Sequence, residues 1–310
     1  MKIGFQMDPI ESLNIAGDSS FALMIEANKR GHDVFHFTPN ELMYKNAEVF
    51  ALSRKLDSIS DNTGDLYKIV FEKLINLKSL DIVFLRQDPP FNMAYITSTY
   101  LLEMIENDVK IINRPSEVRN CPEKVFLNKW PDLSPSTLIT RNINEINNFR
   151  EIHKSIIIKP LYGNGGSGVF LLKKNDKNFS SIIETFLEKS MEPLIFQEYL
   201  PEIKNGDKRI ILIDGEPSGI INRIPSKNEF RANLHVGGRA TKDKLNKNDK
   251  KICSIIAPEL KKRGLFFVGI DIIGESLTEI NVTSPTGIRE IKQLTNINLA
   301  EEIIFLLENS

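Results

Sequence analysis

The chain opens with apolar runs that alternate with a helical apolar pattern. Residues 2–7 (KIGFQM) and 33–37 (DVFHF) are short and mostly apolar, which is typical of buried strands. Between them, Asp18 can cap a helix that Gly31 ends. The apolar positions of this helix recur at helical spacing: Phe21, Leu23, Met24 and Ala27. A strand, a helix and a strand in this order predict a β-α-β unit and a parallel sheet.

The same unit continues through the first third of the chain. Residues 40–80 show no clear period, and 58–64 (SISDNTG) are polar enough to form a loop. A strand at 81–86, a helix at 92–107 and a short strand at 110–113 follow. We therefore expect an N-terminal parallel α/β domain over residues 1–120.

The order of elements changes in the middle of the chain. A connector over 115–135 carries one or two short helices and leads into a small α+β unit. We expect strands at 137–141, 155–161, 168–174 and 194–199, and helices at 142–153 and 178–190. We therefore expect a small central domain over residues 121–200.

Two antiparallel hairpins dominate the last third. They span 208–224 and 266–282, with turns at 214–217 and near Gly274. Helices are predicted at 246–262 and 297–308, whereas 225–240 is polar and without period. We therefore expect a C-terminal antiparallel-sheet domain over residues 201–310.

Composition narrows the functional classes. The chain has 40 Lys and Arg against 41 Asp and Glu, and its net charge of −1 argues against a general nucleic-acid binder. Cys121, Cys253 and the four histidines show no metal-ligand spacing, so we expect reduced thiols. No apolar run reaches the roughly 18 residues of a membrane helix, and residues 1–8 are too short for a signal peptide. We expect a cytoplasmic protein with no membrane or nucleic-acid partner.

A glycine loop lies between two predicted strands. Residues 163–168 read GNGGSG, formally the G-x-G-x-x-G string of dinucleotide-binding proteins, but that motif needs a helix next and an apolar strand begins here at Val169. A loop between strands can instead fold over phosphates, donating backbone N–H groups beside a lysine. The phosphate-binding candidates are then Lys159, Gly163, Gly165, Gly166 and Ser167. The alternative is a flexible hairpin tip.

The last hairpin concentrates carboxylates. Within 269–281 (GIDIIGESLTEIN), a three-residue loop at 274–276 would place Asp271 opposite Glu279, with Asn281 on the same face. Two carboxylates about 5 Å apart repel by roughly 3 kcal/mol at an effective dielectric near 20, so a cation must offset them. Two carboxylates and an amide oxygen suit a hard ion that also binds phosphates, namely Mg²⁺, with Mn²⁺ as a substitute. The alternative is a solvated polar face with a lysine nearby.

These motifs are part of a resemblance that covers almost the entire chain. The segments are MDPI at 7–10, DSSFA at 18–22, RQDPPF at 86–91, IIIKPLYGNGG at 156–166, GDKR at 206–209, RIP at 223–225, VGIDIIG at 268–274 and TEINVTSPTGIRE at 278–290. Together they resemble the bacterial glutathione synthetases. The resemblance implies a three-part ATP-grasp fold with ATP between its central and C-terminal parts. It also implies the ATP-dependent ligation of γ-glutamylcysteine and glycine through an acyl phosphate.

The resemblance also implies roles for individual residues. By this resemblance, the nucleotide phosphates are contacted by Lys124 and Lys159, and the ribose faces Asp207. The adenine binds at a hinge made of Gln197, Glu198, Tyr199 and Leu200. Magnesium is held by Asp271, Glu279 and Asn281, and the reacting carboxyl lies near Arg209 and Arg223. The peptide substrate lies at Ser284, Pro285 and Thr286 and at the RQDPPF segment with Arg86. Tyr162 departs from the family pattern, in which a small acidic residue is expected.

A lid and two alternatives complete the prediction. The acyl phosphate must be kept from water, and the stretch 225–238, ending in Gly237 and Gly238, is the expected lid, from which Arg231 enters the site. The resemblance also implies a homo-oligomer. The alternatives are another ATP-grasp ligase, D-alanine–D-alanine ligase-like or glutamate-adding, and an ATP-binding module without catalysis. The segments at 7–10 and 86–91 favour the synthetase, and the complete metal and arginine set speaks against a pure binding module.

Overall fold

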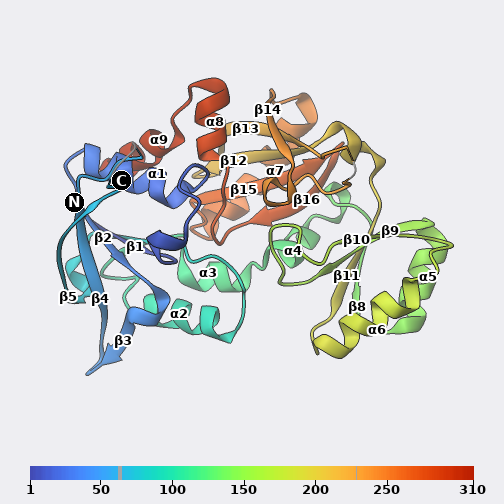
Figure 1. Ribbon diagram of the computed structural model, residues 1–310, viewed down its shortest axis with the longest axis horizontal. Helices are drawn as coiled ribbons and strands as arrows, with labels where there is room; N and C mark the ends of the chain where they lie inside the picture. Colours follow the sequence, from blue (N-terminus) through green and yellow to red (C-terminus); the bar gives the residue numbers. More distant parts are fainter. Residues whose placement is uncertain (62–64, 228) are drawn as a thin grey trace.

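The computed structural model describes residues 1–61, 65–227 and 229–310, without the side chain of His235. The predicted loop at 58–64 therefore lies partly outside the described residues. The strands form separate sheets arranged along the longest axis of the molecule (Figure 1). The first sheet lies at one end, the central sheet at the other, and the third sheet between them.

The first sheet has a parallel centre and an antiparallel extension. β2, β1, β6 and β7 run parallel, and β4 pairs antiparallel with β2 and carries β3 and β5. The strands are β1 (Lys2–Gln6), β2 (Asp33–Phe37), β3 (Leu42–Lys45), β4 (Glu48–Asp57), β5 (Lys68–Asn76), β6 (Ile82–Leu85) and β7 (Lys110–Ile112). The helices here are α1 (Ser19–Lys29), α2 (Met93–Glu103) and α3 (Pro115–Asn120). Asp18 caps α1 by accepting the N–H of Phe21 at 2.6 Å, as the sequence predicts.

The central sheet is antiparallel throughout, in the order β10-β9-β11-β8. Its strands are β8 (Thr137–Thr140), β9 (Ser155–Pro160), β10 (Phe170–Lys173) and β11 (Leu194–Glu198). The helices α5 (Ile143–His153) and α6 (Phe179–Lys189) pack beside it, and α4 (Glu123–Phe126) lies in the connector (Figure 1). The glycine loop joins β9 to β10, so it stands at one end of this sheet.

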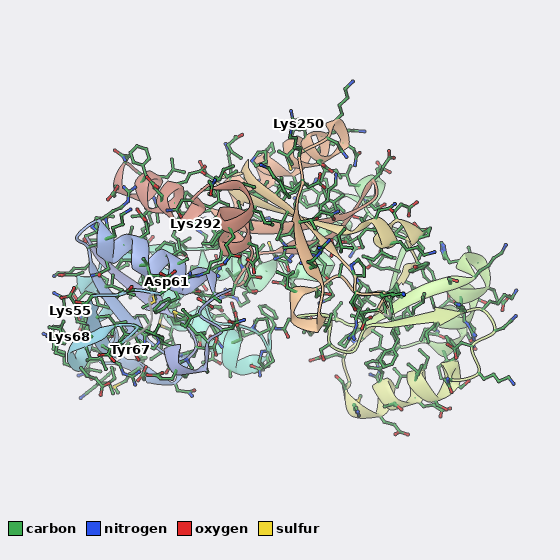
Figure 2. All side chains as sticks on the ribbon, turned by 45° about the horizontal axis from the view of Figure 1, so that its top comes forward. Lys55, Asp61, Tyr67, Lys68, Lys250 and Lys292 are labelled. Carbon is green, nitrogen blue, oxygen red and sulfur yellow. The ribbon has the colours of Figure 1, made fainter. Side chains whose placement is uncertain are left out.

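The third sheet is also antiparallel, in the order β14-β13-β12-β15-β16. Its strands are β12 (Asp207–Ile213), β13 (Glu216–Ile224), β14 (Arg239–Lys242), β15 (Phe267–Ile273) and β16 (Ser276–Asn281). The helix α7 (Lys247–Lys262) buries Ile252 and Ile256 in the same core cluster as Ile270, while Lys250 points to solvent (Figure 2). This amphipathic pattern is the one that the sequence predicts for the helix.

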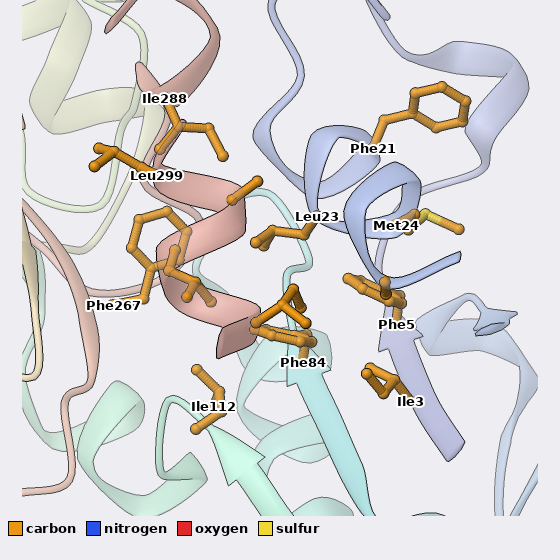
Figure 3. Close-up of a cluster of buried hydrophobic side chains, with 14 of the residues drawn as sticks. Ile3, Phe5, Phe21, Leu23, Met24, Phe84, Ile112, Phe267, Ile288 and Leu299 are labelled. Carbon is orange, nitrogen blue, oxygen red and sulfur yellow. The ribbon is translucent and has the colours of Figure 1, made fainter. Parts of the chain in front are cut away.

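The last helices return to the first sheet. α8 (Ile288–Thr295) and α9 (Leu299–Glu308) contact α1, and Ile288 and Leu299 share a buried cluster with Phe5 and Phe267 (Figure 3). The first and third sheets are therefore joined by one hydrophobic core. Short 3-10 turns link the elements: η1 (Ile10–Ser12), η2 (Pro39–Glu41), η3 (Leu77–Ser79), η4 (Leu127–Lys129), η5 (Pro131–Leu133), η6 (Pro201–Asn205) and η7 (Leu234–Val236).

Within the described part of the chain, no helix combines the length and the apolar character that crossing a membrane requires.

Candidate active site

A cavity of about 630 Å³ opens where the sheets meet. Its wall is made by loops of the first sheet, the glycine loop, the end of β11 and one face of the third sheet. The site residues predicted from the sequence border this cavity, with the exception of Arg86. Segments far apart in the chain thus meet at one place; Thr283 and Glu123, which form a hydrogen bond there, are 160 residues apart.

The third sheet places opposite charges in register on neighbouring strands. Arg209 on β12 lies opposite Asp271 on β15, and Asp207 on β12 lies opposite Arg223 on β13. The Arg209 Nη2 donates to Asp271 Oδ2 at 2.8 Å while its Nε donates to Oδ1, a bidentate pair. Arg223 Nη2 lies 3.0 Å from Asp271 Oδ2 and also donates to Asp207 Oδ2. The face toward the cavity is therefore a buried lattice of guanidiniums and carboxylates.

This lattice separates the proton affinities of its two aspartates. Burial raises the pKa of Asp271, but the Arg209 and Arg223 guanidiniums together lower it by more than burial raises it. The pKa of Asp271 therefore lies below its usual range. Burial raises the pKa of Asp207 to about 7, although Arg223 lies beside it. Within the described atoms, Asp207 Oδ1 is buried without a hydrogen-bond partner. Asp207 thus keeps an acceptor available for a ligand in the cavity.

The carboxylate hairpin has the predicted pairing but a different turn. Asp271 lies opposite Glu279 and Gly269 opposite Asn281, as the sequence predicts. The predicted three-residue loop at 274–276 is wrong, because Ser276 already pairs with Ile273. An irregularity between Asp271 and Ile272 supplies the missing residue of offset. The bulge therefore preserves the register that brings the carboxylates together.

In this structure, cationic side chains contact the carboxylates of the hairpin. The described residues include no group of three or more His, Cys, Asp or Glu placed to hold a metal ion. Asp271 is engaged by Arg209, and Asn281 Nδ2 lies 3.4 Å from Asp271 Oδ2. Glu279 Oε1 lies 3.7 Å from Lys159 Nζ. The donor set of two carboxylates and an amide would suit a hard ion. In the structure as described, Lys159 and the guanidiniums neutralise these carboxylates instead.

The glycine loop lines the same cavity as the lattice. Lys124 Nζ donates to the carbonyl of Gly163, and Arg231 Nη1 donates to the carbonyl of Gly166 at 2.9 Å. Gly166 has φ of +80°, and a Cβ there would come within 2.7 Å of Asn233. Glycine is therefore required where the loop meets the stretch that carries Arg231. Burial lowers the pKa of Lys159, with Glu279 opposing that shift.

The end of β11 forms another part of the wall. Gln197 is buried and its Nε2 donates to Thr137 Oγ1 at 3.2 Å. Glu198 Oε1 accepts the N–H of Ser136 at 3.0 Å, and the Tyr199 N–H donates to the carbonyl of Ser155 at 3.1 Å. These bonds fix the segment that connects the central sheet to η6 and the third sheet.

Arg86 lies behind the cavity wall, contrary to the expectation that it contacts a substrate. It is 3% exposed, its Nε donates to Ser20 Oγ at 2.9 Å, and its Nη2 donates to the carbonyl of Pro285 at 3.0 Å. Its guanidinium lies over the Phe267 ring. Ser284, Pro285 and Thr286 border the cavity themselves, so Arg86 holds their backbone in place from behind.

The sequence interpretation missed some acidic residues of the cavity. Glu123 accepts a hydrogen bond from Thr283 Oγ1 at 2.7 Å, and burial raises its pKa, with Lys124 opposing. Asp8 and Asp88 border the opposite end, where Asp8 Oδ2 accepts the N–H of Asp88 at 2.8 Å. Glu123 lies in a connector without a periodic pattern. Only its position next to Lys124 could have drawn attention to it.

Several solved structures have a similar fold. D-cycloserine synthetase DcsG aligns with a TM-score of 0.70 at 13% identity, covering 99% of each chain. The macrocyclase MdnC of Microcystis aeruginosa, bound to its precursor peptide MdnA, aligns with a TM-score of 0.64 at 15% identity over 100% of each chain. An ATP-grasp ligase, PsnB, aligns with a TM-score of 0.64 at 17% identity, covering 100% of this chain and 99% of its own. At such identities the likeness shows the fold, which is the ATP-grasp fold.

The sequence comparisons then give the family. Residues 1–119 match the model of the prokaryotic glutathione synthetase N-terminal domain, and residues 123–296 match that of the prokaryotic glutathione synthetase ATP-grasp domain. The glutathione synthetase of Brucella melitensis is 50% identical, covering 97% of this chain and 96% of its own, and that of Buchnera aphidicola is 46% identical, covering 99% and 97%. The chain belongs to the prokaryotic glutathione synthetase family and is an ATP-dependent ligase. The predicted family, fold and enzyme class are confirmed.

Proposed function

We propose that the chain joins γ-glutamylcysteine to glycine at the expense of ATP and releases glutathione, ADP and phosphate. The observation that carries the proposal is that the charge lattice of the third sheet and a glycine loop line one cavity. Phosphoryl transfer to a carboxylate brings anionic groups together, and such cations can neutralise them. Family membership selects the two substrates.

The nucleotide would lie between the glycine loop and the lattice. Lys124 and Lys159 would bind its phosphates, together with the N–H groups of Gly163, Gly165, Gly166 and Ser167. The hinge from Gln197 to Leu200, with Glu198 and Tyr199, would bind the adenine. The ribose would meet Asp207, whose Oδ1 is buried and, within the described atoms, without a partner. This assignment gives an otherwise orphaned buried acceptor a partner.

Asp271, Glu279 and Asn281 would hold Mg²⁺, or Mn²⁺ in its place. Lys159 lies 3.7 Å from Glu279, and guanidiniums engage Asp271. A triphosphate would attract Lys159 and the arginines, and the released carboxylates could then take a divalent cation. When bound, the ion would neutralise phosphate charge and orient the γ-phosphate for transfer. Nucleotide and metal are thus expected to bind together.

The chemistry needs no nucleophile from the protein. An oxygen of the dipeptide's cysteinyl carboxylate attacks the γ-phosphorus, the bond to the bridging oxygen of ATP breaks, and ADP leaves. The amine of glycine then attacks the acyl carbon of the acyl phosphate, loses its proton, and expels phosphate. Arg209 and Arg223 would neutralise the reacting groups, and Arg231 would close the site with the 225–238 stretch. Ser284, Pro285 and Thr286 would position the dipeptide, with Arg86 supporting them.

The remaining expectations belong to the same proposal. Residues 1–120, 121–200 and 201–310 would act as the substrate-binding, lid and catalytic domains. We propose a homo-oligomer that works in the cytoplasm, where ATP is supplied, with small-molecule substrates and no nucleic-acid or membrane partner.

The test is ADP release coupled to product formation. Purified protein with Mg²⁺ and ATP should release ADP at full rate only when γ-glutamylcysteine and glycine are both present, with one glutathione for each ADP. Neither D-alanine alone nor glutamate together with glycine or D-alanine should replace γ-glutamylcysteine and glycine. Equal turnover with D-alanine would support the alternative ligase. ATP binding without ADP release under every condition would support a binding module.

A further inference from the structure

An aromatic contact connects the glycine loop to the first sheet's side of the cavity. Tyr162, the residue before the glycine loop, lies with its ring centroid 5.8 Å from that of Phe91, at an interplanar angle of 31°. Phe91 in turn lies 5.1 Å from the ring of Tyr95, which is fully buried on α2. Within the described residues, the other aromatic pairs join rings of one sheet's unit or of the connector.

Both ends of this contact belong to segments that form the cavity. Phe91 lies in the loop after β6, in which the Asp88 side chain hydrogen-bonds with Ser284 and the Asp88 N–H donates to Asp8. Ser284 belongs to the segment assigned to the dipeptide. Tyr162 directly precedes Gly163, whose carbonyl accepts the bond from Lys124. The ring contact therefore connects the dipeptide side of the cavity to its phosphate side.

The glycine loop needs such an anchor because its own residues offer little to hold it. Gly165, Gly166 and Gly168 have φ of +60°, +80° and +67° and carry no side chain that could pack. Tyr162 places a large ring at the base of this loop, on a neighbouring unit rather than on its own sheet. A ring contact of this kind can fix where the loop stands over the phosphates.

We propose that Tyr162 and Phe91 are positioning residues that couple the two halves of the site. When the dipeptide orders the loop from Arg86 to Asn92, Phe91 holds Tyr162 and the glycine loop in the closed position, so ATP binds more tightly. Linkage makes the effect reciprocal. This inference rests on the proposed function, because it assigns the two ends of the contact to the dipeptide and to ATP. One aromatic pair accounts for a coupling of about 2- to 13-fold.

The experiment measures the coupling itself. The dissociation constant of a non-hydrolysable ATP analogue with Mg²⁺ is determined by calorimetry, with and without γ-glutamylcysteine, for the full-length protein and its variants. In the wild-type protein the dipeptide should tighten analogue binding. Tyr162→Leu and Phe91→Leu should each reduce that factor about 2- to 13-fold, and the double variant should add little. Tyr162→Phe keeps the ring and should retain the coupling.

Phe170→Leu is the matched control. Phe170 lies on β10 just beyond the glycine loop, and its ring meets Phe186 at 5.7 Å within the same unit. This variant removes a ring of similar size and should leave the coupling unchanged. Unaltered coupling in Tyr162→Leu, equal loss in Phe170→Leu, or loss in Tyr162→Phe would overturn the proposal. Thermal unfolding of each variant shows whether a lost coupling comes from misfolding. Tyr162→Phe provides a second check, because it changes the same residue but keeps the ring.

The proposal and the proposed function fail in different ways. If the wild-type protein makes no glutathione, the proposed function falls. If it makes glutathione but the dipeptide does not tighten analogue binding, only the coupling is overturned. Turnover gives an independent readout, since Tyr162→Leu should raise the KM values for ATP and dipeptide more than it lowers kcat. A fall in kcat alone would contradict a positioning role.

Discussion

At the scale of the residue, Glu279 tests the metal assignment. Glu279→Gln keeps the side-chain volume but removes a charge that would hold magnesium, so ligation should fall by about 100-fold or more while the fold persists. ADP release over a magnesium titration measures this. The exposed Glu275, at the turn of the same hairpin, provides the control variant Glu275→Gln, which should behave as wild type. Near-normal turnover of Glu279→Gln at saturating magnesium would remove the metal assignment.

Lys159 tests the phosphate assignment at the same scale. It lies at the end of β9, 3.7 Å from Glu279, and faces the cavity. Lys159→Ala should weaken binding of the ATP analogue more than binding of γ-glutamylcysteine, because the ammonium is placed for phosphates. Calorimetry with each ligand separately measures the two losses of affinity. The control variant is Lys173→Ala, which changes an exposed lysine on β10. A larger loss for the dipeptide would reverse the assignment.

At the scale of the element, the packing around α7 and the end of α3 buries the thiols of Cys253 and Cys121 and so controls their reactivity. Burial raises the pKa of both Cys121 and Cys253 to about 12. Because only the thiolate is nucleophilic, both thiols should react slowly with iodoacetamide at about pH 8 in the folded protein. Denaturant should restore the rate of a free cysteine. Mass spectrometry after timed alkylation measures this, and rapid labelling of the native protein would show that the burial is transient.

The elements also show how far the sequence could predict the structure. Strands and helices with a strong period, such as 33–37 and 246–262, match β2 and α7 closely. β5 escaped prediction because it is an edge strand, on which Ile69, Val70 and Leu74 stay exposed and no burial enforces alternation. β14 and α8 are short elements. They lie next to the aperiodic stretch 225–238 and the loop at 284–287, where tertiary contacts rather than a local pattern decide the structure.

The residues of the site depend more on tertiary contacts than the helices and strands do. The pairing of Asp271 with Glu279 is confirmed, but the sequence reached it through the wrong turn: the two-residue turn leaves the register one residue short, and only the irregularity between Asp271 and Ile272 restores it. The bidentate contact of Arg209 with Asp271 depends on β12 and β15, which are 62 residues apart at this pair, and no local pattern encodes it. Arg86 was misplaced for the same reason: its motif identifies the segment, but only the fold shows that the side chain turns away from the cavity toward Pro285.

At the scale of the whole molecule, the first and third sheets share one core. Ile303 on α9 is fully buried in the cluster that contains Phe5 and Leu23. Ile303→Ala should therefore lower the free energy of unfolding by about 2–5 kcal/mol. Phe305→Ala on the same helix is the control, because Phe305 is 54% exposed and its loss should change stability by less than about 0.5 kcal/mol. Urea unfolding followed by circular dichroism measures both, and equal effects would contradict the shared core.

The proposed closure of the site can be tested at the 225–238 stretch. Phe230, Arg231 and Leu234 border the cavity, and Arg231 reaches the glycine loop at Gly166. Asn228 and the side chain of His235 lie outside the described residues. Ordering such a stretch costs about 1–2 kcal/mol of backbone entropy per residue, so the closed state needs ligand contacts to offset it. We therefore expect the stretch to be mobile in the free protein and ordered in the closed complex.

Limited trypsin digestion tests this closure. Cleavage of the free protein should begin at Lys227 or Arg231, and ATP, Mg²⁺ and γ-glutamylcysteine together should protect both bonds, whereas ATP alone should protect them less. Arg231→Ala should remain sensitive at Lys227 even with all ligands, because its contact with Gly166 is lost. Cleavage that starts elsewhere, or that ignores the ligands, would mean that this stretch is not the lid. The glycine loop, held by Lys124 and Tyr162, would then have to exclude water from the acyl phosphate by itself.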